Sequence, residues 1–241
     1  MTLEEITDHL ESLSDPERAR QAARYFKAVP GGYGEGDRFF GIAVPTIRKM
    51  VKKFPDISID TLQSLLQSAF HEARLFALLA LVSRFEKGDD VVREKIFRLY
   101  LDNTKSIDNW DLVDSSAPHI LGCHLKECDR GILYKLAQSD SIWERRMAVL
   151  ATFCYIRDGD FDDAFSIAGS LLADPEDLIH KAAGWMLREI GKRDHLAEAS
   201  FLDRHYREMP RTMLRYAIEK FEPALRKKYL TGAIRTPPIP G

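Results

Sequence analysis

The sequence predicts an all-α fold built from stacked helical repeats, and three observations lead to this prediction. Almost every segment between turn signals places its apolar residues at helical period, as in LFALLALVSRF, and no segment shows the alternation of a strand. Similar helical strings recur along the middle of the chain. The 241 residues are 45% apolar and 30% charged, which is typical of a globular protein.

Helix starts are visible at two places. Ser14-Asp15-Pro16-Glu17 puts a capping residue before a proline, and Asp174-Pro175-Glu176-Asp177 repeats this arrangement. The acidic side chains favour the positive end of a helix. Each start predicts a helix of roughly 12 to 17 residues.

One extended loop, residues 29–41, interrupts the helical pattern. Five of its thirteen residues are glycine, which raises the entropy cost of a fixed conformation and predicts a mobile element. In the alternative, Tyr33, Phe39 and Phe40 pin the loop against the first helices. Both interpretations stay open at this point.

An internal repeat organises the middle of the chain. Aligning HEARLFALLAL, WERRMAVLATF and IHKAAGWMLRE brings Arg74, Arg146 and Ala182 into register, with spacings of 72 and 36 residues. The missing copy then centres on Trp110 and the next one on Ile218. A period near 36 predicts one domain, residues 1–241, with about six helix pairs stacked into a solenoid that has a concave face. Residues 230–241 are expected to form a frayed tail.

Charge and motifs narrow the function classes. The net charge is −2, but residues 181–241 carry 13 Lys and Arg against 7 Asp and Glu, so a polyanion could bind one face only. The chain has no GxxxxGK[ST], HExxH or GxSxG motif, and Gly34-Glu35-Gly36 lacks the third glycine of a dinucleotide site. No membrane span or secretory signal is visible, and three cysteines suit a reducing compartment, so we expect a cytoplasmic protein.

A zinc site is the first candidate for chemistry. His119, Cys123, His124 and Cys128 are close in sequence, and the first two share a helix face. Their spacing matches no structural zinc module, and buried helical cysteines are more often small apolar filler. The sequence therefore predicts no metal.

A cluster of indoles, cations and one carboxylate is the stronger candidate. Trp110 and Asp114 are four residues apart on one helix face, whereas Asp111 points elsewhere. As an isolated pair they would fit a core indole and a capping or exposed acid. Corresponding positions of later repeats, however, carry the following side chains: Trp143 and Arg146, then Lys181, Trp185, Arg188 and Lys192. We expect these residues to line one surface that suits a polyanion whose reacting centre becomes cationic.

At these residues the chain resembles the AlkD-type DNA alkylation-repair glycosylases, which are built from HEAT-like repeats. The resemblance spans nearly the whole chain, from Ala23-Arg24-Tyr25 through WDLVDS at 110–115 and Ile142-Trp143 to KAAGWMLRE at 181–189. The loop at Gly31–Arg38 departs from the family pattern because it is longer and richer in glycine. This departure leaves the approach of DNA and the substrate range open.

The resemblance implies a monomeric, monofunctional DNA N-glycosylase that removes cationic N3- or N7-alkylated purines from double-stranded DNA without a metal or organic cofactor. It implies Asp114 as the catalytic acid and Trp110 and Trp185 as indoles beside the lesion. The DNA-binding residues expected from the resemblance and the ridge are Tyr25, Arg146, Lys181, Arg188 and Lys192. Two alternatives remain: a non-catalytic binder of damaged or branched DNA, and a protein-binding helical scaffold.

Overall fold

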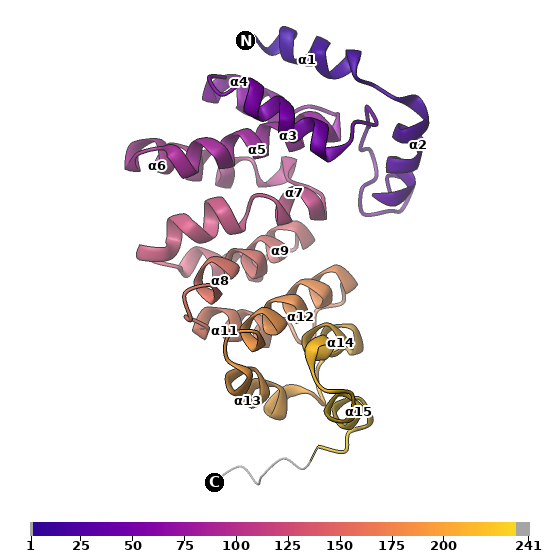
Figure 1. Cartoon of the computed structure of the whole chain (residues 1–241), viewed down its shortest axis with the longest axis vertical. Coiled ribbons are helices and arrows are strands. Elements are labelled where there is room, and N and C mark those ends of the chain that lie inside the picture. Colours follow the sequence, from indigo (N-terminus) through magenta and orange to yellow (C-terminus); the bar gives the residue numbers. More distant parts are fainter. Residues whose placement is uncertain (1, 235–241) are drawn as a thin grey trace. The chain divides into compact units, whose positions relative to one another are not determined.

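The computed structural model describes residues 2–234 and confirms the all-α prediction (Figure 1). Within these residues there is no β-strand, only an isolated bridge between Arg38 and Phe70. None of the described helices is long and apolar enough to cross a membrane. The chain comprises two compact units, Met1–His124 and Leu125–Gly241. The single repeat domain stays a prediction.

The first unit contains α1 Leu3–Ser12, α2 Pro16–Tyr25, α3 Val44–Lys53, α4 Ile59–Leu66, α5 His71–Lys87, α6 Asp90–Asp102, the 3₁₀ turn η1 Thr104–Ser106, α7 Trp110–Asp114 and the π-helical turn η2 Pro118–Gly122. Helix α5 packs against α3, α4, α6 and α7. It is buried on nearly all sides because it is the central helix of this unit.

The second unit contains the 3₁₀ turn η3 Leu125–Glu127, α8 Gly131–Ala137, α9 Ile142–Ala151, α10 Phe153–Ile156, α11 Asp162–Ser170, α12 Asp177–Gly191, α13 His195–His205, α14 Arg211–Ala217, the 3₁₀ turn η4 Ile218–Lys220 and α15 Pro223–Thr231. Helix α12 lies between α9 and α14, and its outer neighbours are α11 and α13. The helix pairs α8 and α9, α11 and α12, and α13 and α14 therefore follow one another as repeats.

A recurring hydrogen bond fixes the register of the repeats. Arg74 Nη1 donates to the carbonyl of Ser68 (2.9 Å), and Arg145 Nη1 donates to that of Ser139 (2.9 Å). His180 Nε2 lies 2.6 Å from the carbonyl of Asp174. In each case the partner is six residues earlier, so the equivalent residues are Arg74, Arg145 and His180.

The predicted register of Arg74, Arg146 and Ala182 is therefore wrong by one residue in the second copy and by two in the third. The physical reason lies in the core, because α5 and α9 are buried on most sides. When a helix is apolar on all sides, its sequence can be aligned with another such helix one residue out of register, and the apolar positions still appear to match.

Several helix boundaries also differ from the predicted ones. Asp15 caps α2 as expected, but α2 spans 10 residues and ends at Tyr25. Helix α12 begins at Asp177, because the Asp174 carboxylate instead accepts a hydrogen bond from the amide of Glu176 (2.8 Å) in the preceding turn. Ile218 begins η4 and does not lie inside α14.

The predicted tail at 230–241 starts too early, because residues 230 and 231 complete α15. Gly232 then ends this helix with a left-handed φ of 74°. Residues 235–241 lie outside the described part of the chain.

The end of the loop at 29–41 is held as the second interpretation expects for Phe39 and Phe40. Phe40 stacks on Phe70 with a ring separation of 3.9 Å, and Phe39 stacks on His71. Gly41 approaches the Asp15 carbonyl so closely that a Cβ atom would lie 2.3 Å from it. These contacts pin the end of the loop against α2 and α5.

Candidate functional site

An aromatic cluster surrounds Trp110, the first residue of α7. Phe26 stacks on the indole with a ring separation of 5.4 Å, and Tyr25 meets its edge at 5.8 Å. Tyr25 is 66% exposed, so a large ligand can reach its ring. Two of the residues predicted from the sequence, Tyr25 and Trp110, are thus in contact in the first unit.

Below this cluster a buried histidine lies between two carboxylates. His71 Nδ1 is 2.8 Å from Asp37, its Nε2 is 2.9 Å from Asp111, and only 2% of its side chain is exposed. Burial by itself would lower the pKa of His71. The hydrogen bonds and charges of Asp111 and Asp37 outweigh burial and raise this pKa to about 9. His71 is therefore an imidazolium at neutral pH.

The same network continues through a buried arginine. Arg74 donates to Asp37 (2.7 Å) and to Asp108 (3.0 Å). Burial works to raise the pKa of Asp37, but His71 and Arg74 lower it below its ordinary value. The sequence alone did not predict this charge network. The only signal was the presence of Asp108 and Asp111 on either side of Trp110, and the partners of these two acids, Arg74 and His71, lie 34 and 40 positions earlier in the chain.

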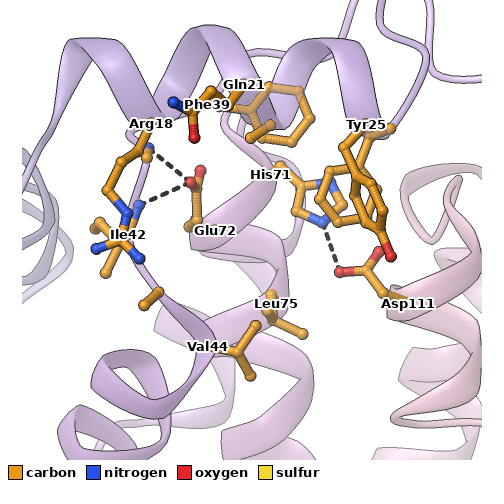
Figure 2. Close-up of a pocket in the computed structure, with 14 residues that line it drawn as sticks. Arg18, Gln21, Tyr25, Phe39, Ile42, Val44, His71, Glu72, Leu75 and Asp111 are labelled. Atoms are coloured by element: carbon orange, nitrogen blue, oxygen red, sulfur yellow. Dashed lines mark hydrogen bonds and ion pairs between the residues drawn. The ribbon is translucent and has the colours of Figure 1, made fainter.

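Glu72 holds the end of the glycine-rich loop. Its carboxylate accepts hydrogen bonds from the amides of Phe40, Gly41 and Ile42, at 2.9, 2.8 and 3.1 Å. Figure 2 shows Glu72 beside this segment and His71 joined to Asp111. A cavity of about 450 Å³ opens here, with Arg18, Gln21 and Tyr25 of α2 on one side and Leu75 and Asp111 among its other walls.

Asp114 faces a second cavity of the first unit. This cavity has a volume of about 440 Å³, and Asp114 lines it together with Ser115 and His119. Helix α3 contributes Arg48 and Lys52 to the same walls. Asp111 belongs to the first cavity and Asp114 to the second, which agrees with the expectation that the two acids point in different directions.

In the second unit, the predicted cationic ridge lies along α12. Three of its members form local ion pairs: Lys181 with Asp177 at 2.8 Å, Lys192 with Glu189 at 2.5 Å, and Arg188 with Glu219 of η4. Trp185 is half-buried, and its indole N–H donates to Glu189 (3.2 Å). A polyanion that binds this ridge would compete with these carboxylates.

Arg146 lies deeper than the ridge residues. It is 5% exposed, and its Nη1 donates to the carbonyl of Leu178 (2.6 Å). At least one donor group of the Arg146 guanidinium is therefore already used in a hydrogen bond to the backbone. Its predicted contact with DNA stays a prediction.

Several candidate residues occupy equivalent positions when residues are counted from the start of α3, α5, α7, α9, α12 and α14, which we call the inner helices. The fifth residues of α3, α5, α7, α9, α12 and α14 are Arg48, Leu75, Asp114, Arg146, Lys181 and Arg215. Leu75, Leu79, Val82 and Glu86 of α5 line the two cavities. In the same count they correspond to Lys181, Trp185 and Arg188 of α12 and to Lys192, which caps its C-terminal end. Each unit thus carries its candidate residues on the equivalent face of its repeats.

Within the described residues, no group of three or more His, Cys, Asp or Glu side chains could hold a metal ion. His124 of the zinc interpretation instead contacts Glu94 at 3.1 Å and stacks on Phe97. His119 lies 3.6 Å from Glu86.

Comparisons with known proteins identify relatives of the chain. The model of a family described as DNA alkylation repair enzyme matches residues 6–221. A solved structure described as a predicted DNA alkylation repair enzyme from Enterococcus faecalis is 16% identical and has a TM-score of 0.66; the match covers 87% of this chain and 97% of that one. This likeness shows a shared fold. No curated protein matches the sequence.

Proposed function

Because the chain belongs to the DNA alkylation repair enzyme family, we propose that it is a DNA N-glycosylase that excises N3- and N7-alkylated purines from duplex DNA. The observation that carries this proposal is the place of Asp114. Its carboxylate lines a cavity with two cations of α3, at the helix position where α3, α9, α12 and α14 carry arginine or lysine and α5 carries leucine. An acid that shares a cavity with two cations suits a polyanion that develops local positive charge.

The chemistry follows from the charge of the substrate. Alkylation at N3 or N7 makes the purine cationic, so its glycosidic bond is weakened and the base can leave without being protonated. As the bond breaks, positive charge moves to the sugar. A carboxylate fixed beside the sugar stabilises this charge, and such preorganised contacts contribute about 10²- to 10³-fold in rate.

The carboxylate also helps to orient the attacking water, which adds to the sugar and loses one proton to the solvent while the neutral base departs. Trp110 and Trp185 are proposed to present π faces to the sugar and the cationic base, with cation–π attraction of about 1 to 2 kcal/mol each. Lys181, Arg188 and Lys192 are proposed to bind phosphates of the DNA. Arg146 is proposed to bind the same sugar-phosphate backbone. No lysine lies in the WDLVDS string, so a step that forms a Schiff base has no support.

The direct test is release of 7-methylguanine and 3-methyladenine from methylated duplex DNA by the purified full-length chain. We expect both bases to be released under single-turnover conditions, and the abasic strand to remain uncleaved until it is treated with alkali. Binding to duplex DNA without release of either base would instead identify a non-catalytic DNA binder. Absence of salt-dependent DNA binding would favour the protein scaffold.

A further inference from the structure

Helix α3 is a strongly basic element of the first unit that the sequence analysis did not connect with DNA. Its ten residues, VPTIRKMVKK, include four cations and no acid. The cations are Arg48, Lys49, Lys52 and Lys53, and all four are exposed. Within residues 2–234, neither Arg48 nor Lys52 forms an ion pair with a carboxylate, so both are available for another anion.

Only two of the four cations face the cavity that Asp114 lines. Arg48 and Lys52 belong to its walls, whereas Lys49 and Lys53 do not. The first two lie four residues apart, about one helical turn, and therefore project from the same side of α3. Lys53 instead lies 5.2 Å from the centre of the Phe54 ring.

The repeat register supports the same assignment independently of the cavity. Arg48 is the fifth residue of α3, as Asp114 is the fifth residue of α7. In α12 this position is occupied by Lys181, the first cation of the ridge that the sequence predicts to bind DNA. Helix α3 packs against α5, as α12 packs against α14. Helix α3 is thus the first inner helix along the chain that carries a cation at this position.

Charge explains why cations are needed beside Asp114. The cavity also contains Glu86 of α5, so two carboxylates would face an approaching DNA backbone. Each carboxylate repels an approaching phosphate, and water screens part of this repulsion because the Glu86 side chain is 59% exposed. Arg48 and Lys52 supply the opposite charge on the facing wall, and His119 lies beside Glu86 at 3.6 Å. The DNA backbone would therefore lie against α3, with its sugar edge toward Asp114.

We propose that Arg48 and Lys52 bind the phosphodiester backbone of the damaged strand next to the alkylated nucleotide, and thereby hold its sugar at Asp114. The proposal rests on the proposed function, because it assumes that DNA is the substrate. It assigns to the first unit a phosphate-binding wall of its own, in addition to the ridge on α12. Phosphate contacts carry no sequence information, so this wall acts alike on all sequences.

The test compares two double variants of the full-length chain that lose the same charge from the same helix. Arg48→Gln with Lys52→Gln removes the cations of the cavity, and Lys49→Gln with Lys53→Gln is the matched control. The logarithm of the binding constant falls linearly with the logarithm of the salt concentration. We expect the first variant to make this slope less steep by about one unit for each cation removed. We also expect its excision rate at subsaturating DNA to fall at least about tenfold. The control should change both quantities by less than half as much.

Equal losses in the two variants would overturn the proposal, because they would show a general effect of net charge. Loss of excision by the first variant with an unchanged salt slope would also overturn the proposal, because phosphate contacts would then not be the cause. In both cases a parent protein that releases methylated bases would leave the proposed function intact. A parent that binds no duplex DNA would instead contradict the proposed function itself. Thermal unfolding of each variant separates these results from misfolding.

Discussion

At the scale of single residues, the charges around His71 determine how the first unit responds to pH. The imidazolium is buried between Asp37 and Asp111, and Phe26 and Phe39 contact its ring. In the unfolded chain a histidine has a pKa of about 6.5. The folded protein binds the proton more tightly, since the pKa is about 9.

This difference predicts a loss of stability at alkaline pH. The folded state holds more protons than the unfolded state between about pH 6.5 and 9, so the stabilisation by His71 is fully present below pH 6.5 and disappears as pH rises through 9. A shift of this size corresponds to roughly 3 kcal/mol. In His71→Gln, the free energy of unfolding should change much less between pH 6.5 and 9.5 than in the parent.

His119→Gln is a suitable control for chemical denaturation at these pH values, because 44% of the His119 side chain is accessible, against 2% for His71. The control should show the same pH dependence as the parent. If the His71→Gln variant kept the full alkaline loss, the imidazolium between the two carboxylates would not be its source.

At the scale of elements, Glu72 connects the start of α5 to the end of the glycine-rich loop. Three backbone amides share its carboxylate, and the side chain is 4% exposed. Glu72→Gln replaces an acceptor oxygen with an NH₂ group, which cannot accept these hydrogen bonds. Hydrogen bonds to a charged group contribute about 1.5 to 3 kcal/mol, so we expect destabilisation of about 2 kcal/mol in equilibrium denaturation.

Hydrogen exchange should locate this effect at the loop. The amides of residues 40–42 are expected to exchange faster in Glu72→Gln, while those in the middle of α5 stay protected. Glu86→Gln, on the exposed end of the same helix, should leave residues 40–42 unchanged. Fast exchange of these amides in the parent would contradict the pinned loop.

Helices were predictable because their signals are local. The cap at Asp15 and the proline after it determine the start of α2, and the apolar period predicts α5 and α12. The contacts of the loop were not predictable, because its anchors Phe70 and Glu72 lie about 30 residues later in the sequence. The predicted alignment of the repeats was wrong because apolar strings indicate which face is buried but not which residues form equivalent hydrogen bonds. Those hydrogen bonds show that Arg74 and Arg145 are equivalent.

At the scale of the whole molecule, both units contain candidate residues, and all of these except Tyr25 of α2 lie on or directly after the inner helices. Tyr25, Trp110 and Asp114 belong to the first unit, and the predicted cationic ridge belongs to the second. The indoles and cations were predicted because they recur at the repeat period, whereas Tyr25 and the catalytic role of Asp114 were expected from the family resemblance. Arg48 and Lys52 were not predicted, since α3 precedes the strings from which the period was derived.

The ridge on α12 makes a prediction about salt. Lys181→Gln and Arg188→Gln should each lower the salt slope of duplex binding by about one unit and weaken all DNA sequences alike. The ion pairs with Asp177 and Glu219 partly offset the gain from each contact, because phosphate must displace a carboxylate.

Arg193→Gln is the matched control for these two substitutions. Arg193 follows the ridge, and it bonds the carbonyl and carboxylate of Glu189. It should leave the slope unchanged. A change of sequence preference with a constant salt slope would argue against phosphate contacts on α12.

In the proposed mechanism, Asp114 supplies the negative charge that cleavage of the glycosidic bond requires. Asp114→Asn keeps the shape of the side chain and removes this charge, and its comparison variant is Asp111→Asn, whose carboxylate holds His71 instead. The decisive measurement is the single-turnover rate of 7-methylguanine release with duplex binding measured in parallel. We predict that Asp114→Asn binds DNA like the parent but releases the base about 10²- to 10³-fold more slowly, whereas Asp111→Asn loses stability more than rate. A release rate for Asp114→Asn within about twofold of the parent would contradict the account, since such preorganised charges contribute far more than this.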